Sequence, residues 1–598
     1  MQQSAPPQES NQVSMRGYTL DNAQRDGVTD YLVAGHGGFD YSLIERIEVV
    51  KGPSGILYGA HSPGGIVNLI SKRPLSEPRT EINVMAGSDE MYRAELDTSN
   101  FFDQDRRFGY RLAAARADTE GVASDRPQEG NGLLAINPSV SFRSDNGWNV
   151  WAWAAIMRDH MRRSTYGTPA LPTDPDFSYP GDPSTTGAPL YEVAGNHMLR
   201  NLQYIDSETY ELGVSKSFEL GPVTVDMRLL GRDYHQEGID LGRIRAIDAF
   251  DILVGHDGHI IGTDFRAVPL SAAEGRVAQI GRSAIRYDAN PVRRDGRIGS
   301  ADFNFSFDLG PTRHQLLSYV TYGSQDRLSN KSTYDIRDVD TLASMGVPII
   351  DGKPVVVYWP APEVTPTVEE VIELADRRNV ANDIRLDSDE LSYGFIERLS
   401  FWDDRIFLVG GFRHDSLDST TASIINNTPV SPIEDRDRVD TYSFSALAKV
   451  YESAKGEASV FYNNNETFIP VTTIDRRLAT YGQKYPNRIA SNDEFGFKLD
   501  LFESRVVATV SIFKTTETNV LVTEHDDTGE ITGIIGTYFK TPVGTRTTKG
   551  WEADINIAAT DSLEFIVAYA DVDPRLETGN YAQKIAFDTF TLAGRYEI

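Results

Sequence analysis

Apolar and polar residues alternate with a period of two over long stretches of this chain. In residues 300–310, Phe303, Phe305 and Phe307 share one face of an extended strand, and Asn304 and Ser306 share the other. Residues 223–232, 441–450 and 551–557 alternate in the same way. A period of two predicts strands with one dry and one wet face. Such runs, at about 3.3 Å per residue, are long enough to cross a tilted hydrocarbon layer.

Short turns and long polar segments alternate as the connections between these runs. Gly221-Pro222, residues 145–147 and Asp403-Asp404 are short turns. The long polar segments are residues 162–207, 237–299, 328–388, 418–440, 469–491 and 523–546. About 18 runs follow residue 79, and no apolar stretch is long enough for a spanning helix. The pattern predicts an all-β membrane protein, a large antiparallel transmembrane β-barrel. The residues expected to face lipid include Phe303, Phe305, Phe307, Val225, Met227 and Leu229.

Composition narrows the possible partners and chemistry. The 598 residues carry a net charge of −29, which argues against nucleic acid as a partner because phosphates would be repelled. Cysteine is absent, which removes disulfides and thiolate chemistry together. No nucleophile–base signature stands out. We therefore expect no enzyme activity, no resident cofactor and no metal site.

Residues 41–74 contain a distinctive motif, YSLIERIEVVKGPSGILYGAHSPGGIVNLISKRP. Its pattern predicts a strand over residues 44–50, a turn, a Gly-rich bend and a second strand over residues 66–70. The string closely resembles the end of the plug domain of TonB-dependent outer-membrane receptors, especially the ferric-siderophore branch. The residues that match this plug motif are Glu45, Arg46, Glu48, Lys51, Gly52, Pro53, Tyr58, Gly59, Pro63, Gly64, Gly65 and Asn68.

The resemblance extends over nearly the whole chain. Residues 14–18 and 26–28 resemble earlier plug signatures, and residues 462–468, 494–498 and 548–552 resemble barrel segments of the family. It implies a partial plug domain at residues 1–75 and a barrel at residues 76–598. The family barrel is of the 22-strand type, so we expect the C-terminal strands, the signal peptide and the TonB box to be missing from this chain.

The resemblance also implies a function. A member of that family is a multi-pass protein of the cell outer membrane of Gram-negative bacteria. It is expected to be a monomer surrounded by lipid that binds a ferric siderophore and imports it. TonB and the inner-membrane ExbB/ExbD complex supply the energy. The alternatives are the same architecture importing cobalamin, haem or an oligosaccharide and, more remotely, a passive porin or a structural surface β-protein.

Candidate ligand contacts follow from the resemblance. The plug signature places Arg16 near the apex, where its guanidinium suits an anionic ligand; the alternative is a structural arginine paired with a carboxylate. Residues 31–40 fall at an apical plug loop. The further candidates are Tyr31, His36 and Phe39 in that loop and Tyr358 and Trp359 in a long barrel loop. Glu45, Arg46, Glu48 and Lys51 are expected to be structural. Three tryptophans, Trp148, Trp151 and Trp153, are expected to form a lipid-facing or interfacial belt.

Overall fold

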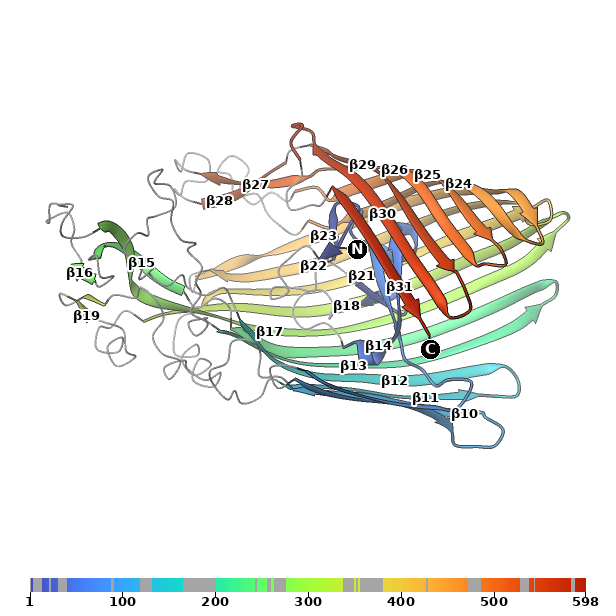
Figure 1. The fold of residues 1–598 in the computed structure, drawn as a ribbon, viewed down its shortest axis with the longest axis horizontal. Helices are drawn as coiled ribbons and strands as arrows, with labels where there is room; N and C mark the ends of the chain where they lie inside the picture. The colour runs from blue at the N-terminus through green and yellow to red at the C-terminus, as the bar shows by residue number, and fades with distance from the viewer. Residues whose placement is uncertain are drawn as a thin grey trace.

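The chain folds into a large curved β-sheet that surrounds a small N-terminal domain (Figure 1). The computed structural model describes residues 2–3, 13–20, 23–30, 40–87, 91–118, 132–164, 200–241, 245–254, 260–262, 276–336, 349–350, 353–354, 380–425, 428–471, 485–526, 537–542, 544–581 and 587–597. Within these residues, no helix is long and apolar enough to cross a membrane.

The large sheet consists of 18 antiparallel strands. They are β8 (Arg79–Ala86), β9 (Tyr92–Phe101), β10 (Phe108–Asp118), β11 (Gly132–Arg143), β12 (Trp148–Ser164), β13 (Arg200–Leu220), β14 (Val223–Leu241), β17 (Arg276–Leu309), β18 (Thr312–Ile336), β21 (Val380–Phe401), β22 (Ile406–Ile425), β23 (Thr428–Ser453), β24 (Gly456–Ile469), β25 (Arg488–Leu501), β26 (Val506–Thr518), β29 (Arg546–Ala558), β30 (Leu563–Leu576) and β31 (Asp588–Tyr596). This confirms the predicted all-β fold with about 18 barrel strands.

The sheet has the strand order of a barrel, in which β31 is followed by β8. The residue-by-residue pairings among described residues run without a break from β8 to β31, but none joins these two strands directly. Both strands are exposed along nearly their whole length. This exposure fits strands that have a hydrogen-bonded neighbour on one side.

Shorter strands extend from the long-loop end. β15 (Arg245–Val254) pairs with β17 and with β16 (Ile260–Gly262). Two small hairpins join β19 (Ile349–Ile350) to β20 (Lys353–Pro354) and β27 (Leu521–Asp526) to β28 (Thr537–Pro542). The opposite end of the barrel carries short turns such as those at Gly147, Gly221 and Gly310, each with a positive φ.

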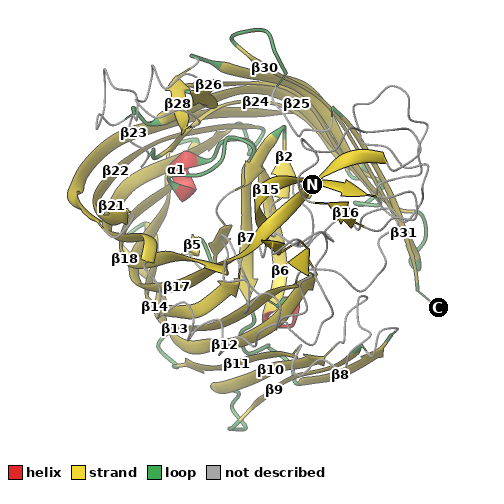
Figure 2. Ribbon diagram, turned by 90° about the vertical axis from the view of Figure 1, so that its left-hand side faces the viewer, coloured by secondary structure: helices red, strands yellow, loops and turns green. Residues whose placement is uncertain are grey.

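The N-terminal domain lies inside the barrel (Figure 2). Its four-stranded sheet has the order β5-β4-β7-β6. The strands are β4 (Ala23–Arg25), β5 (Val28–Asp30), β6 (Ile44–Lys51) and β7 (Gly65–Ser71), with the 3-10 turn η1 (Tyr41–Leu43) before β6 and the helical turn α1 (Gly55–Tyr58) between β6 and β7. A second small sheet contains β1 (Gln2–Gln3), β2 (Val13–Met15) and β3 (Tyr18–Leu20). We call these elements the plug.

Alternation along the strands decides which face each residue takes. In β14, Arg228 and Arg232 reach plug carbonyl groups, so the even-numbered residues of this segment face the lumen. Leu230 follows this rule and packs with plug residue Val28. By alternation the odd-numbered Val225, Met227 and Leu229 take the outer face with their register partners Phe305, Phe303 and Ala301 in β17; Leu229 is exposed there, whereas Val225 is covered by its neighbours to 2% and Met227 also borders the cavity beside the plug. The predicted division into a dry and a wet face agrees with this arrangement.

Two expectations from the sequence were wrong. Trp151 and Trp153 do not face lipid: they are 4% and 3% exposed and pack in the lumen with Leu43 of η1. Only Trp148 is on the opposite, outer face of β12, where Lys216 lies over its ring. Residues 418–440 and 237–299 are not long loops, because β22 and β23 continue through most of the first range and β14, β15, β16 and β17 through most of the second. The strands in the first range carry charged residues where other strands carry apolar ones, so the alternating pattern that predicts a strand is absent.

A substitution pair tests the two faces of β17. Phe303→Arg should lower the free energy of unfolding by about 2–4 kcal/mol in lipid, because it places a cation on the outer face within the expected hydrocarbon depth. Asn304→Arg, one residue along on the lumen face, should cost much less. Urea titrations of both variants in lipid vesicles measure the difference. Equal destabilisation would contradict the assignment of faces.

Candidate functional site

The plug motif folds around its glycines. Gly52, with φ 80°, makes the turn after β6, and Gly59, with φ 69°, ends α1. At Gly55 an added Cβ would lie 2.4 Å from the carbonyl oxygen of Glu466 in β24, so only glycine allows α1 to approach that strand. The glycine-rich bend therefore sets the plug directly against the barrel backbone.

Arg16 joins the plug to the wall formed by β25 and β29. Its Nη2 lies 3.0 Å from Oε1 of Glu494, its Nε lies 3.2 Å from Oε1 of Glu552, and its guanidinium stacks over Phe513 with a centroid distance of 4.3 Å. The Arg16 side chain is 2% exposed. Burial alone lowers the pKa of Arg16, but the attraction of Glu552 and Glu494 outweighs it and raises the net pKa. Arg16 is therefore a buried cation balanced by two barrel carboxylates.

A second buried cluster lies around Glu211 of β13. Its carboxylate accepts hydrogen bonds from Arg232 at 2.6 Å, from Arg73 of the plug at 3.1 Å and from the indole of Trp151 at 2.9 Å. Arg232 also donates to the carbonyl oxygen of plug residue Arg25 at 3.1 Å. Trp151 and Trp153 therefore contact the plug: both pack with Leu43, and Arg73 lies over the Trp151 ring.

His61 links the plug bend to β24 and is fully buried, at 2% exposed. Its Nε2 accepts the backbone N–H of Ser54 at 3.0 Å, so Nδ1 carries the proton and donates to the Thr467 hydroxyl at 2.6 Å. That hydroxyl lies 3.2 Å from the carbonyl oxygen of Gly59, to which it donates. Burial lowers the pKa of His61 to about 4. The chain of bonds requires the neutral ring.

The carbonyl groups at the end of α1 are also held by barrel side chains. The Tyr319 hydroxyl donates to the carbonyl oxygen of Ile56, and Arg413 donates to that of Leu57 at 3.4 Å. Arg413 is itself paired with Asp415 at 2.8 Å. These bonds satisfy carbonyl groups that a single helical turn leaves without internal partners.

The charged residues of the motif lie in pairs. Glu45 pairs with Arg111 of β10 at 2.8 Å, and Lys51 pairs with Asp554 of β29 at 2.6 Å. Arg46 and Glu48 pair with each other at 2.7 Å on the exposed side of β6. The turn and the bend also contain Pro53, Pro63, Gly64 and Gly65. Asn68 joins neighbouring parts of the plug, because its amide donates to Glu48 at 3.0 Å and accepts from the backbone N–H of Gly27 at 3.1 Å.

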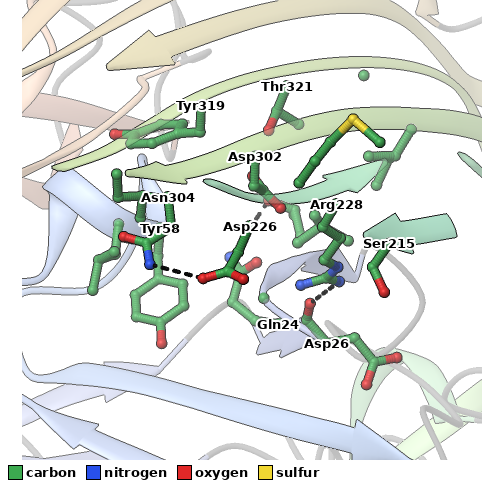
Figure 3. Close-up of a pocket in the computed structure, with 18 of the residues that line it drawn as sticks. Gln24, Asp26, Tyr58, Ser215, Asp226, Arg228, Asp302, Asn304, Tyr319 and Thr321 are labelled. Carbon is green, nitrogen blue, oxygen red and sulfur yellow. Dashed lines mark hydrogen bonds between the residues drawn. The ribbon is translucent and has the colours of Figure 1, made fainter. Parts of the chain in front are cut away.

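A cavity of about 680 Å³ separates the plug from the wall formed by β13, β14, β17 and β18 (Figure 3). Its lining from the plug includes Gln24, Thr29 and Tyr58, and its lining from the barrel includes Asp226, Arg228 and Asn304. Arg228 donates to the carbonyl oxygen of Asp26 at 2.9 Å, which is one direct contact across this gap. Because Gly147, Ser217 and Asp226 lie near short turns, the cavity lies toward that end of the barrel.

The structure locates only part of the predicted ligand set. Arg16 lies in the ion-pair cluster described above, the arrangement that the structural alternative anticipated. Tyr31, His36, Phe39, Tyr358 and Trp359 lie outside the described residues. In the described part of the chain, no group of three or more His, Asp or Glu side chains is arranged to hold a metal ion.

The sequence did not single out several residues that complete the interface. His61 and Arg413 carry no pattern that marks them as plug contacts. Glu494 and Glu552 do stand in segments that resemble family strands, but their pairing with Arg16 joins residues 478 and 536 positions apart. Strand alternation predicts which face of the sheet Glu494 and Glu552 occupy, but it does not predict that Arg16 is their ion-pair partner.

Comparison with known proteins agrees with this architecture. Residues 1–66 match the TonB-dependent Receptor Plug Domain family. The ferrichrome outer membrane transporter/phage receptor of Escherichia coli K12 is 33% identical over 132 residues, which is 21% of this chain and 17% of that protein. The probable TonB-dependent receptor BfrD of Bordetella pertussis is 23% identical over 548 residues, which is 89% of this chain and 65% of that protein.

Two solved structures show the same fold. The ferripyoverdine receptor of Pseudomonas aeruginosa has a TM-score of 0.67 at 17% identity, covering 99% of this chain and 70% of that one. The ferric-catecholate import receptor Fiu of E. coli K12 has a TM-score of 0.68 at 18% identity, covering 98% and 78%. The fold is a β-barrel with a plug in its lumen. Residues 1–66 are similar to the plug domain of TonB-dependent receptors.

Removing Arg16 tests the ion-pair cluster. Arg16→Met leaves Glu494 and Glu552 buried without their cation, so plug docking should weaken by about 3–5 kcal/mol. Arg46→Met removes an exposed pair on β6 and should change docking by less than about 1 kcal/mol. Limited proteolysis of the plug in urea measures both effects. A plug that stays as protected in Arg16→Met as in the unmodified protein would show that the cluster does not hold it.

The His61 contact predicts a pH dependence. The ring binds its proton more readily in the unfolded chain, at a pKa near 6.5, than in the folded protein, at about 4. Stability from this group is therefore complete above about pH 6.5 and is lost as the pH falls toward 4. His61→Gln should flatten that part of the curve. The test compares unfolding free energies of both proteins from pH 4 to pH 8; parallel curves would contradict the assignment.

Proposed function

We propose that this protein is an outer-membrane receptor that binds a ferric siderophore outside the cell and imports it with energy from TonB. The observation that carries the proposal is a plug held inside a barrel by ion pairs and single hydrogen bonds. Siderophore receptors recur among the similar proteins, including one named for ferrichrome and one for ferripyoverdine. The aligned regions span less than a fifth of those two relatives.

In this proposal, residues 1–75 act as the plug and residues 76–598 as the barrel of a monomer surrounded by outer-membrane lipid. The cargo is an iron complex that the protein transports without chemical change, so the protein is a transporter rather than an enzyme and needs no cofactor of its own. TonB, coupled to ExbB/ExbD in the inner membrane, supplies the energy. Tyr31, His36, Phe39, Tyr358 and Trp359 remain candidate contacts for the cargo. Arg16 is proposed to act through plug docking.

The polar interface suits a plug that must move. Each bond between plug and barrel can be exchanged for a bond to water, so separating the two surfaces costs less than opening a dry apolar core of equal area. Ligand binding on one side and TonB on the other could then bias one two-state equilibrium. The cavity beside Tyr58 and Asn304 offers space along the wall into which plug or cargo can move.

A binding and uptake assay tests the proposal. The protein should bind a ferric siderophore tightly, with little binding of cobalamin, haem or maltodextrin, when tryptophan fluorescence is followed during titration. Cells that make the protein should take up radioactive iron from that siderophore only when TonB is present. Uptake that persists without TonB would indicate a passive pore. Tight binding of cobalamin, haem or a glycan alone would replace the cargo and retain the receptor.

A further inference from the structure

The bend that contains α1 is bonded to the barrel through one histidine. His61 uses both ring nitrogens: Nε2 accepts the backbone N–H of Ser54 at 3.0 Å, and Nδ1 lies 2.6 Å from the Thr467 hydroxyl of β24. The backbone N–H of His61 also donates to the carbonyl oxygen of Phe468 at 3.2 Å. These bonds hold residues 54–62 against β24, and we call this segment the clasp.

The bonds of the clasp need an uncharged ring. A backbone N–H can only donate, so Nε2 of His61 can accept it only while that nitrogen carries no proton. Protonation would turn the ring nitrogen into a second donor facing the N–H of Ser54. It would also place a positive charge in a buried site, which is costly unless a partner balances it. Acid therefore removes one bond from the clasp and adds a buried charge to it.

The charged groups around the clasp do not balance a proton on His61. Arg413 of β22 acts on the ring as a like charge, and its own partners are Asp415 at 2.8 Å and Glu390 at 3.9 Å. On β24, the side chain of Glu466 is hydrogen-bonded on the outer face of the strand. Burial and the charge of Arg413 together hold the pKa of His61 at about 4. The other titratable groups that line this part of the interface are the phenols of Tyr58 on α1 and Tyr319 on β18.

The clasp also forms part of the wall of the cavity between plug and barrel. Tyr58 of α1 and Tyr319 of β18 both line that cavity (Figure 3), as does Arg413. Tyr319 and Arg413 donate to carbonyl groups of α1 from the same wall. On its other side α1 meets β24 through Gly55, which packs against the strand backbone. Movement of the clasp away from β24 would therefore widen the cavity toward that strand.

We propose that His61 makes the plug an acid-sensitive gate: when the ring takes up a proton, the clasp leaves β24 and the cavity beside it opens into a passage for small ions. The inference concerns the closure of the barrel and not its cargo, so it stands or fails independently of siderophore uptake. A proton that binds the open state more tightly than the closed state shifts the equilibrium toward the open state.

The two proton affinities set the size of the effect. With a pKa of about 4 in the closed state and the ordinary value of 6.5 once the ring meets water, the ratio of open to closed protein should rise about twentyfold between pH 7 and pH 5. Most carboxylates keep their charge over this range, because their ordinary pKa values lie near 4. A response between pH 7 and pH 5 therefore points to histidine.

Conductance of the complete protein in planar lipid bilayers tests the gate, with potassium chloride as the probe. The unmodified protein should conduct little at pH 7 and about twentyfold more at pH 5, and the current should fall again when pH 7 is restored. His61→Gln cannot take up the proton and should lose this acid-dependent step, whether its current at pH 7 is low or already raised. The matched control, His414→Gln, alters a histidine of β22 that pairs with Asp440, and it should keep the step.

A pair of variants at Thr467 tests the clasp without changing the histidine. Thr467→Val removes the hydroxyl that meets the ring, so the current at pH 7 should rise about fivefold, as expected for the loss of one hydrogen bond. Thr467→Ser keeps the hydroxyl and should conduct as the unmodified protein does. Equal currents from the two variants would overturn the role of the clasp. An unmodified protein without an acid step, or a His61→Gln variant that retains the full step, would overturn the gate itself.

Discussion

The pairing of buried charges between plug and barrel is the interaction on which this structure depends. A barrel-shaped sheet with alternating faces places its polar side chains in the lumen, so a domain inside it meets charged groups on several sides. Removing such groups from water costs several kcal/mol each unless they find partners. Arg16 with Glu494 and Glu552, and Arg73 and Arg232 with Glu211, meet that requirement. Each cluster contains groups from both parts, so neither part is electrostatically complete alone.

This constraint explains why the plug carries little apolar core of its own. Its most buried apolar side chains, Ile66 and Leu69, lie on β7, the strand between β4 and β6. Further apolar contact comes from the barrel, where Leu43 packs with Trp151 and Trp153. Small plug sheets cannot bury enough surface by themselves to offset the entropy of ordering. The barrel supplies both the missing apolar contacts and the missing counter-charges.

How much the sequence could predict follows from the range of each interaction. Alternation is local, so it identified the strands and assigned Phe303 and Asn304 to opposite faces. The motif around Gly52 and Gly59 is also local, because it depends on positive φ and close packing. The sequence wrongly predicted that Trp151 and Trp153 face lipid, because a tryptophan suits either a lipid belt or a contact with the plug. Which of the two applies depends on which residues of β12 point into the lumen, and the sequence does not determine that. The partner of Arg16 depends on strands far away in sequence.

The sequence also predicted the strands to be shorter than they are, for a related reason. Residues 418–440 are charged on the outer face, where Asp418 pairs with Arg438 at 3.1 Å and Asp440 with His414 at 2.7 Å. Such cross-strand pairs hold a ladder together where no hydrocarbon covers it, yet they remove the apolar half of the pattern from which a strand is predicted. Hydrophobic alternation therefore marks the part of a strand that is covered by apolar material and not the full length of its hydrogen-bonded ladder.

The contacts around the plug are also unequal in kind. On the β25 and β29 side, separation would expose Arg16 and two glutamates that are each at most 10% exposed. On the β14, β17 and β18 side, a cavity already lies between the two surfaces, and Arg228 crosses it with a single bond to a backbone carbonyl. Polar groups that border a water-sized space lose little when that space widens, because water can replace the broken bond. Buried ion pairs therefore resist movement of the plug at two places, the Arg16 cluster on β25 and β29 and the Glu211 cluster on β13 and β14, and the cavity is where the plug surface meets the barrel with the least buried charge.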